Sequence, residues 1–214
     1  MWFSSDNAAG AAPEVLEALA KTSAGWSMAY GNDETTSNAA AMIRERFEAP
    51  DAAIYFVATG TAANSLSLAC LAPPWSTIYC HDKAHIEEDE CNAPEFFTGG
   101  AKLTLVDGTH GRIAANTLRN RIAATPQGDV HAAQRGAFSI TNATEAGTVY
   151  DVAAVEALAG VAHDAKIGVH MDGTRFAYAT AALGCSPADL SWKAGVDLLC
   201  LGAPKNGALA AEAV

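Results

Sequence analysis

The sequence has little positive charge. Lys and Arg together number 13 against 24 Asp and Glu, so the formal net charge is -11 at pH 7, and no basic cluster occurs in the 214 residues. Nucleic acids and anionic membrane surfaces attract proteins through basic patches. The composition therefore argues against a nucleic acid or a membrane as a partner.

Long hydrophobic runs are missing as well. No apolar run approaches the roughly 20 residues that a membrane-spanning helix needs. The first ten residues, MWFSSDNAAG, have neither a basic start nor a continuous apolar stretch, so they lack the pattern of a signal peptide. We therefore expect a cytoplasmic protein.

Metal-binding or disulfide patterns of cysteine are also absent. The five cysteines are odd in number, scattered, and never spaced as CxxC. Two of them, Cys70 and Cys200, end apolar runs, where a reduced cysteine packs as a small hydrophobic residue. This usage predicts no metal site and no disulfide framework, and it suits a reducing compartment.

What the sequence does contain is a regular alternation of strand-like and helix-like segments. Apolar runs of strand length are found at 52–57, 76–80, 102–106, 136–141, 167–171 and 198–201. Helical patterns are found at 13–21, 36–47, 113–124, 151–164 and 176–183. A further helical stretch ends at 71, and we expect Ser186 to cap a short helix. Such alternation predicts an α/β fold with three layers, in which helices cover both faces of a mostly parallel sheet.

Several polar residues follow the predicted strands. Parallel strands joined by right-handed crossovers place their carboxyl ends at one edge of the sheet, where ligands bind in open α/β folds. The residues expected at that edge are Gly60, Thr61, His85, Asn142, Asp172, Arg175 and Lys205.

Lys205 follows the apolar strand 198–201 within GAPKNG. Burial there would lower the pKa of the amine and make it a nucleophile able to form a Schiff base. The alternative is a solvated loop lysine, which this stretch alone favours.

The turn at Gly60 and Thr61 lies between a strand and a helix, so it can offer backbone N–H groups and a positive helix end to an anion. Many such turns carry these residues only for capping. Asp172, after another strand, could pair merely with Arg175. Taken together in chain order, however, an anion-binding turn, a strand-end aspartate and a lysine are what pyridoxal phosphate requires.

Four consecutive acids, Glu87 to Glu90, follow His85. Consecutive residues on a helix cannot all face one metal ion. We therefore expect a solvated face with one or two acids turned inward.

A further set of motifs carries a resemblance to a known family. In chain order they are Ser5-Asp6, AYGND (29–33), ATGTAAN (58–64), KAHI (83–86) with Glu90, His131, Thr141-Asn142, HMDGTR (170–175) and PKNG (204–207). With these motifs the chain resembles threonine aldolases of the β-eliminating lyase group, within the fold-type-I pyridoxal phosphate enzymes. It looks most similar to the low-specificity threonine or phenylserine aldolase branch.

The resemblance implies a cofactor site. Lys205 would be the Schiff-base lysine, and Asp172 would pair with the pyridinium nitrogen. Gly60 and Thr61 would hold the phosphate, and Asn142 would belong to the same site.

It also implies a substrate site. His85 would stack on the cofactor ring and, with His131 arriving from a neighbouring subunit, would address the substrate β-hydroxyl. Ser5 and Arg175 would bind the substrate carboxylate, with Arg175 also near the cofactor, and Tyr30 would help to close the site.

The implied reaction is retro-aldol cleavage of threonine, allo-threonine or phenylserine to glycine and an aldehyde, in a homodimer or homotetramer with shared active sites. A different pyridoxal phosphate reaction on the same fold, such as another lyase reaction or a transamination, is one alternative. An inactive truncated fragment is another.

Two departures from the family pattern stand out. Pro204 occupies the position before the lysine, where the family usually has a small hydroxyl residue that touches the phosphate. The second is length: we expect residues 1–214 to be the cofactor-binding large domain, with an N-terminal arm at about 1–30, lacking the smaller C-terminal domain.

Overall fold

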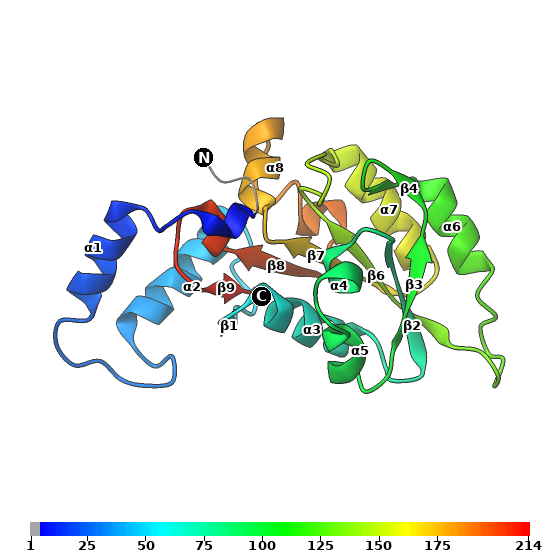
Figure 1. The fold of residues 1–214 in the computed structure, drawn as a ribbon, viewed down its shortest axis with the longest axis horizontal. Coiled ribbons are helices and arrows are strands. Elements are labelled where there is room, and N and C mark those ends of the chain that lie inside the picture. Colours follow the sequence, from blue (N-terminus) through cyan, green and yellow to red (C-terminus); the bar gives the residue numbers. More distant parts are fainter. Residues whose placement is uncertain (1–4) are drawn as a thin grey trace.

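Seven strands form one mixed sheet in the computed structural model, which describes residues 5–214 (Figure 1). From one edge to the other the strands are β1 (Phe56–Val57), β9 (Glu212–Ala213), β8 (Leu198–Gly202), β7 (Gly168–Gly173), β6 (Gln134–Thr141), β2 (Ser76–His81) and β3 (Lys102–Val106). The five strands from β8 to β3 run parallel, and only β9 runs against its neighbours β1 and β8. The predicted mostly parallel sheet is confirmed.

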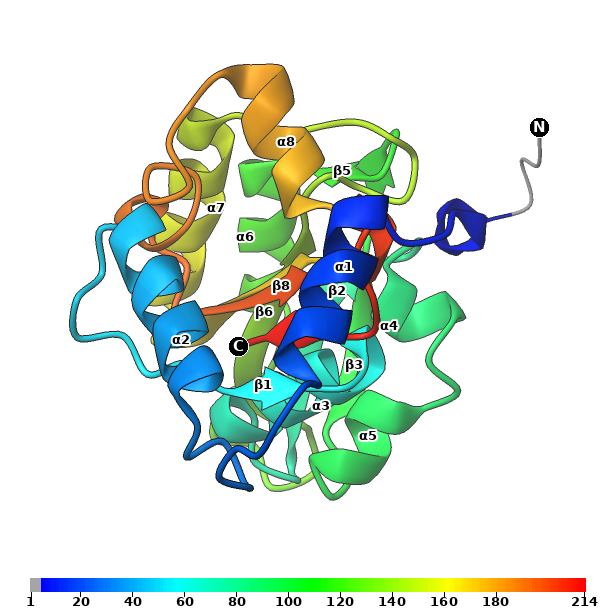
Figure 2. The same cartoon turned by 90° about the vertical axis from the view of Figure 1, so that its left-hand side faces the viewer.

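Helices cover both faces of this sheet (Figures 1 and 2). The helices are α1 (Pro13–Thr22), α2 (Glu34–Arg46), α3 (Gly60–Leu71), α4 (His85–Glu88), α5 (Ala93–Phe97), α6 (Ala115–Ala123), α7 (Val152–Asp164) and α8 (Phe176–Leu183). Short 3₁₀ turns occur at η1 (Asp6–Ala8), η2 (Trp192–Ala194) and η3 (Pro204–Asn206), and a small hairpin is formed by β4 (Gly108–Thr109) and β5 (Arg112–Ile113).

Two apolar clusters lie on opposite faces of the central strands. The larger one packs α6 and α7 against Phe138 and Met171, and the smaller one packs Leu68 of α3 against Ile78 and Ala137. Strand residues alternate between the two clusters because successive side chains point to opposite faces. This two-sided burial explains why the central strands read as continuous apolar runs.

Side chains at the helix starts explain two of the boundaries. Asp151 accepts a hydrogen bond from the Ala154 N–H at 2.8 Å and so caps α7. Thr59 accepts one from the Ala62 N–H at 3.2 Å and so caps α3. Each bond satisfies one of the N–H groups that a helix start leaves free.

Two sequence predictions are wrong. The run 52–57 forms a strand only at Phe56–Val57, because β1 lies at the sheet edge and has a neighbouring strand, β9, on one side only. Ser186 caps no α-helix, because its hydroxyl accepts the Asp189 N–H at 3.0 Å within the turns at 187–191 that lead to the short 3₁₀ helix η2.

The helices α1 and α2 lie beyond the β1 end of the sheet (Figure 1). Neither helix has a buried residue. Among the described residues, no helix is both long and apolar enough to cross a membrane.

Leu68 and Leu66 provide a matched pair for testing the core. Both lie on α3, but Leu68 is fully buried whereas Leu66 is 50% exposed. Replacing Leu68 with Ala should reduce the free energy of unfolding by about 2–5 kcal/mol, because the change removes apolar contacts and leaves a cavity. Replacing Leu66 with Ala should cost about 0.5 kcal/mol or less. Urea unfolding of both variants tests this, and equal losses would contradict the described packing.

Candidate active site

The predicted site residues converge where the parallel strands end. Asp172 lies in β7, Lys205 in η3 just after β8, His85 at the start of α4 beyond β2, and Gly60 at the start of α3 beyond β1. A hollow of about 270 Å³ is lined by Gly60, Thr61, His85 and Lys205 together with Glu212 of β9. Through these residues four elements line one hollow, and Asp172 of β7 lies next to it, hydrogen-bonded to the lining residue Asn64.

Lys205 lies inside this hollow. Its side chain is only 8% exposed, and its Nζ lies 3.7 Å from Asp6 Oδ1. The alternative of a solvated loop lysine is therefore wrong. The position is set by β8, which ends at Gly202 and leads directly into η3.

Arg175 pairs with Asp6 rather than with Asp172. Its Nε donates to Asp6 Oδ2 at 2.5 Å and its Nη2 donates to Asp6 Oδ1 at 3.2 Å. Burial by itself would raise the pKa of Asp6, but the hydrogen bonds and charge of Arg175 outweigh burial and lower it. The local Asp172–Arg175 pair considered from the sequence is thus wrong, and the guanidinium instead binds the Asp6 carboxylate through two nitrogen atoms.

Asp172 is a buried carboxylate held by hydrogen bonds. Its Oδ1 accepts the Thr174 backbone N–H at 3.0 Å, and its Oδ2 accepts the Asn64 side-chain amide at 3.0 Å. Burial alone would raise the pKa of Asp172, but these donors, led by the Thr174 N–H, bring it below its usual value. The site therefore contains a fixed negative charge at the end of β7.

His170, two residues earlier on β7, points to the same face as Asp172. Its two ring nitrogens lie 2.9 Å from Ser139 Oγ and 3.2 Å from Cys200 Sγ. Burial lowers the pKa of His170 to about 4, so the ring is neutral near pH 7. It packs behind the site as an uncharged group.

A second carboxylate, Glu90, links His85 to Asp172. Glu90 Oε1 lies 2.8 Å from His85 Nδ1 and accepts the Asn64 amide at 2.7 Å, so Asn64 bridges the two acids. The hydrogen bond to Glu90 raises the pKa of His85 although burial opposes it. Glu90 is buried while Glu87, Glu88 and Asp89 are exposed, as predicted for one inward-facing acid.

The turn before α3 has the geometry of an anion site. An added Cβ on Gly60 would come within 3.4 Å of Thr174 Oγ1 and 3.8 Å of Glu212 Oε1, so the glycine leaves room for a group to approach the helix start. Free N–H groups and the helix dipole favour an anion there. The assignment of a phosphate to this turn remains a prediction.

Six predicted residues do not line the hollow, namely Asp172 and Arg175, described above, and four others. Tyr30 is fully exposed in the loop between α1 and α2, and His131 is exposed in the loop before β6, at the opposite, amino-terminal edge of the sheet. The buried Asn142 amide is engaged by the Tyr150 N–H and carbonyl, both at 3.1 Å. Ser5 accepts the Asn7 N–H at 3.1 Å and lies beside Asp6.

Sequence reasoning missed three residues as members of the site: Asp6, Asn64 and Glu212. Asn64 had a usable signal, because it lies four residues after Gly60 and so on the same face of α3. Asp6 and Glu212 reach the site only through the folding of distant segments, and although Asp6 stands in the Ser5-Asp6 motif, the sequence assigned neither residue a role.

Three atoms that could bind a metal ion lie within 4.8 Å of one another, one each from His85, Glu90 and Asp172. They are close enough to surround a cation. However, the Asn64 amide already donates to both carboxylates. A cation between them would have to displace these donors, so a hydrogen-bonded network describes the group better.

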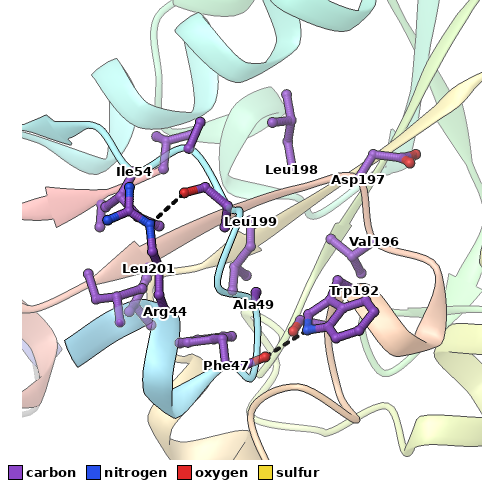
Figure 3. Close-up of a pocket in the computed structure, with 16 residues that line it drawn as sticks. Arg44, Phe47, Ala49, Ile54, Trp192, Val196, Asp197, Leu198, Leu199 and Leu201 are labelled. Atoms are coloured by element: carbon purple, nitrogen blue, oxygen red, sulfur yellow. Dashed lines mark hydrogen bonds between the residues drawn. The ribbon is translucent and has the colours of Figure 1, made fainter. Parts of the chain in front are cut away.

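A second hollow, of about 150 Å³, lies between α2 and β8 and is mainly apolar (Figure 3). Its walls include Phe47, Ile54, Leu199 and Leu201, and at its rim the Trp192 Nε1–H donates to the Phe47 carbonyl at 2.7 Å. None of the predicted site residues lines it. The hollow that contains Lys205 is therefore the candidate active site.

Fold and site together define a class of protein. The structure superposes on the threonine aldolase of Leishmania major with a TM-score of 0.90 and 25% sequence identity, covering 97% of this chain and 60% of that one. A putative L-allo-threonine aldolase from Listeria monocytogenes matches with a TM-score of 0.74 at 16% identity, over 95% of this chain and 55% of that one, and shows the same fold. The class is defined by the fold of the fold-type-I enzymes, which include threonine aldolases and aminotransferases.

Within this class the chain belongs to the beta-eliminating lyase family, whose sequence profile matches residues 3–214. It is 43% identical to a low specificity L-threonine aldolase of Pseudomonas aeruginosa and 41% identical to one of Pseudomonas sp., over 99% of this chain in each case. The chain spans 60% of the length of both relatives. The resemblance seen in the motifs is confirmed.

The His85–Glu90 pair leads to a testable expectation. Replacing Glu90 with Gln keeps a hydrogen-bond acceptor but removes the charge that stabilises the imidazolium, so the pKa of His85 should fall. In the native chain this pair stabilises the folded state fully when the pH is below the ordinary histidine pKa. The stabilisation is lost as the pH rises through the raised pKa of His85. NMR titration of the His85 ring measures the change. Glu88→Gln, at an exposed acid that bonds Lys83, is the control, and an unchanged His85 titration in Glu90→Gln would contradict the assignment.

Proposed function

We propose that this chain is the cofactor-binding part of a pyridoxal phosphate aldolase that cleaves a β-hydroxy-α-amino acid to glycine and an aldehyde. The observation that carries the proposal is the buried Lys205 amine in one hollow with His85, near the buried Asp172 carboxylate. The two Pseudomonas relatives named as L-threonine aldolases favour threonine or a similar amino acid as the substrate.

The residues around the hollow fit pyridoxal phosphate. Lys205 Nζ would be the covalent attachment point, and the anionic Asp172 would keep the ring nitrogen protonated. The start of α3, with no side chain at Gly60, suits the phosphate. Bound there, the cofactor supplies a protonated pyridine ring that draws negative charge away from the substrate Cα.

His85 would accept the proton of the substrate β-hydroxyl. Its Nδ1 faces Glu90, which leaves Nε2 for the substrate, and the Glu90 charge stabilises the imidazolium that forms. The arrangement follows the same logic as a histidine oriented by a carboxylate in hydrolases. A neutral His85 is required at the start, so activity should rise with pH through its raised pKa.

Arg175 would bind the substrate carboxylate. Its guanidinium already binds the Asp6 carboxylate through two nitrogen atoms, which supports a role in binding a carboxylate. Asp6 is partly exposed on η1, beside Ser5, so a substrate could share or displace this contact. Fixing the carboxylate would orient the scissile bond against the cofactor ring.

A homodimer or homotetramer with shared sites is proposed as well. Tyr30 and His131 are exposed and do not reach the hollow of their own chain. Large apolar side chains on and beside α1 and α2, namely Leu16, Leu19, Trp26, Met28 and Met42, are at least half exposed. Such a surface is typical of a protein interface.

The five free cysteines suit a cytoplasmic location.

Lys205→Ala tests the cofactor assignment. Mixing the native protein with pyridoxal phosphate should give the visible absorption band of the lysine-bound cofactor, whereas the variant should give none because the attaching amine is absent. Lys193→Ala, at an exposed lysine paired with Glu48, should keep the band. A band that persists in Lys205→Ala would rule out this lysine.

Product analysis separates the reactions that this fold supports. Threonine or phenylserine should yield glycine and an aldehyde, whereas ammonia and a keto acid would favour elimination, and amino-group transfer would favour a transaminase. His85→Ala should lower kcat about 10²–10⁴-fold if it acts as the general base. No turnover by a chain that nevertheless binds the cofactor would favour an inactive fragment.

A further inference from the structure

Glu212 is a buried acid that the proposed chemistry does not use. It lies on β9, between Val57 of β1 and Gly202 of β8, and its side chain lines the hollow that contains Lys205. The residue is only 4% exposed, and its Oε2 has no hydrogen-bond partner among the described residues. A buried polar atom without a hydrogen-bond partner costs free energy of folding, so we expect this oxygen to form a hydrogen bond with a ligand.

The carboxyl group lies beside the start of α3. Its Oε1 would be 3.8 Å from a Cβ added to Gly60, and its Oε2 would be 2.8 Å from one added to Gly202. The side chain therefore fills the space between the first residue of α3 and the end of β8, where both elements lack a side chain. A group bound to the N–H groups of α3 would be within reach of Glu212.

The charges around Glu212 favour its protonated form. Burial, followed by the negative charge of Asp172 on β7, raises the pKa of Glu212 to about 7, and Lys205 on η3 only partly offsets these effects. On β8 the buried Cys200 thiol has a raised pKa and is uncharged. The residues of β1 and of the first turn of α3, including Thr61, carry no charge.

We propose that Glu212, as a neutral carboxylic acid, donates a hydrogen bond from its O–H to the phosphate of the cofactor at the start of α3. This inference rests on the proposed function. Pro204 stands where the family usually has a hydroxyl residue that touches the phosphate, and proline cannot donate a hydrogen bond. The Glu212 O–H would supply the phosphate contact that Pro204 cannot make. An ionised Glu212 would instead repel the phosphate, so binding would weaken as pH rises.

The experiment compares pyridoxal phosphate with pyridoxal, which lacks the phosphate. The ratio of the affinity for pyridoxal phosphate to the affinity for pyridoxal isolates the phosphate contacts, because attachment to Lys205 is common to both compounds. For the native chain we expect this ratio to fall about tenfold from one pH unit below to one unit above the pKa of Glu212. Titration of the phosphate itself, with a pKa near 6, would act in the opposite direction at a helix start.

Glu212→Gln keeps an N–H donor and cannot ionise, so its ratio should stay high at both pH values. Glu212→Ala removes the donor and should give a low ratio at both. Glu156→Gln, at an exposed acid on α7, makes the same change in net charge far from the site and should behave as the native chain. Melting temperatures establish that each variant is folded.

If the ratios of Glu212→Gln and the native chain change equally with pH, the inference is wrong although the proposed function stands. The same conclusion follows if Glu212→Ala matches the native chain. If the native chain forms no lysine-bound cofactor at all, the proposed function fails, and this inference fails with it.

Discussion

The structure of the site depends on burying the Asp172 carboxylate, whose hydrogen-bond donors among the described residues are uncharged. An unpaired buried charge is costly, and here two uncharged donors, the Thr174 backbone N–H and the Asn64 amide, offset part of that cost. Because Asn64 also donates to Glu90, the orientation of His85 is tied to the same network. A change at Asn64 would therefore disturb the acid at the end of β7 and the histidine on α4 together.

The network also concentrates negative charge. Asp172 and Glu90 are both buried beside one hollow, and Lys205 is the only Lys or Arg that lines it among the described residues. Sites that are strained or repulsive when empty are a common cost of function. A protonated ring facing Asp172 would relieve this repulsion, which is why the arrangement favours a cationic ring over an uncharged ligand.

The central part of the fold could be predicted from the sequence because strands buried on both faces read as apolar runs, as at 136–141 and 198–201. The edge could not be predicted in the same way. The run 52–57 has the composition of a strand, but a strand also needs a partner, and only Phe56 and Val57 lie in register with β9. Ser186 looks like a helix cap, yet its hydroxyl closes a turn instead.

By itself the sequence determined which residues follow the strands, and hence that Gly60, His85, Asp172 and Lys205 would meet at one edge, because parallel strands align their carboxyl ends. Only the tertiary structure decided which partners these residues have. Asp6 reaches Arg175 from the start of the chain and Glu212 reaches Gly60 from its end. Such contacts arise from packing between elements far apart in the chain, and local sequence patterns carry no record of them.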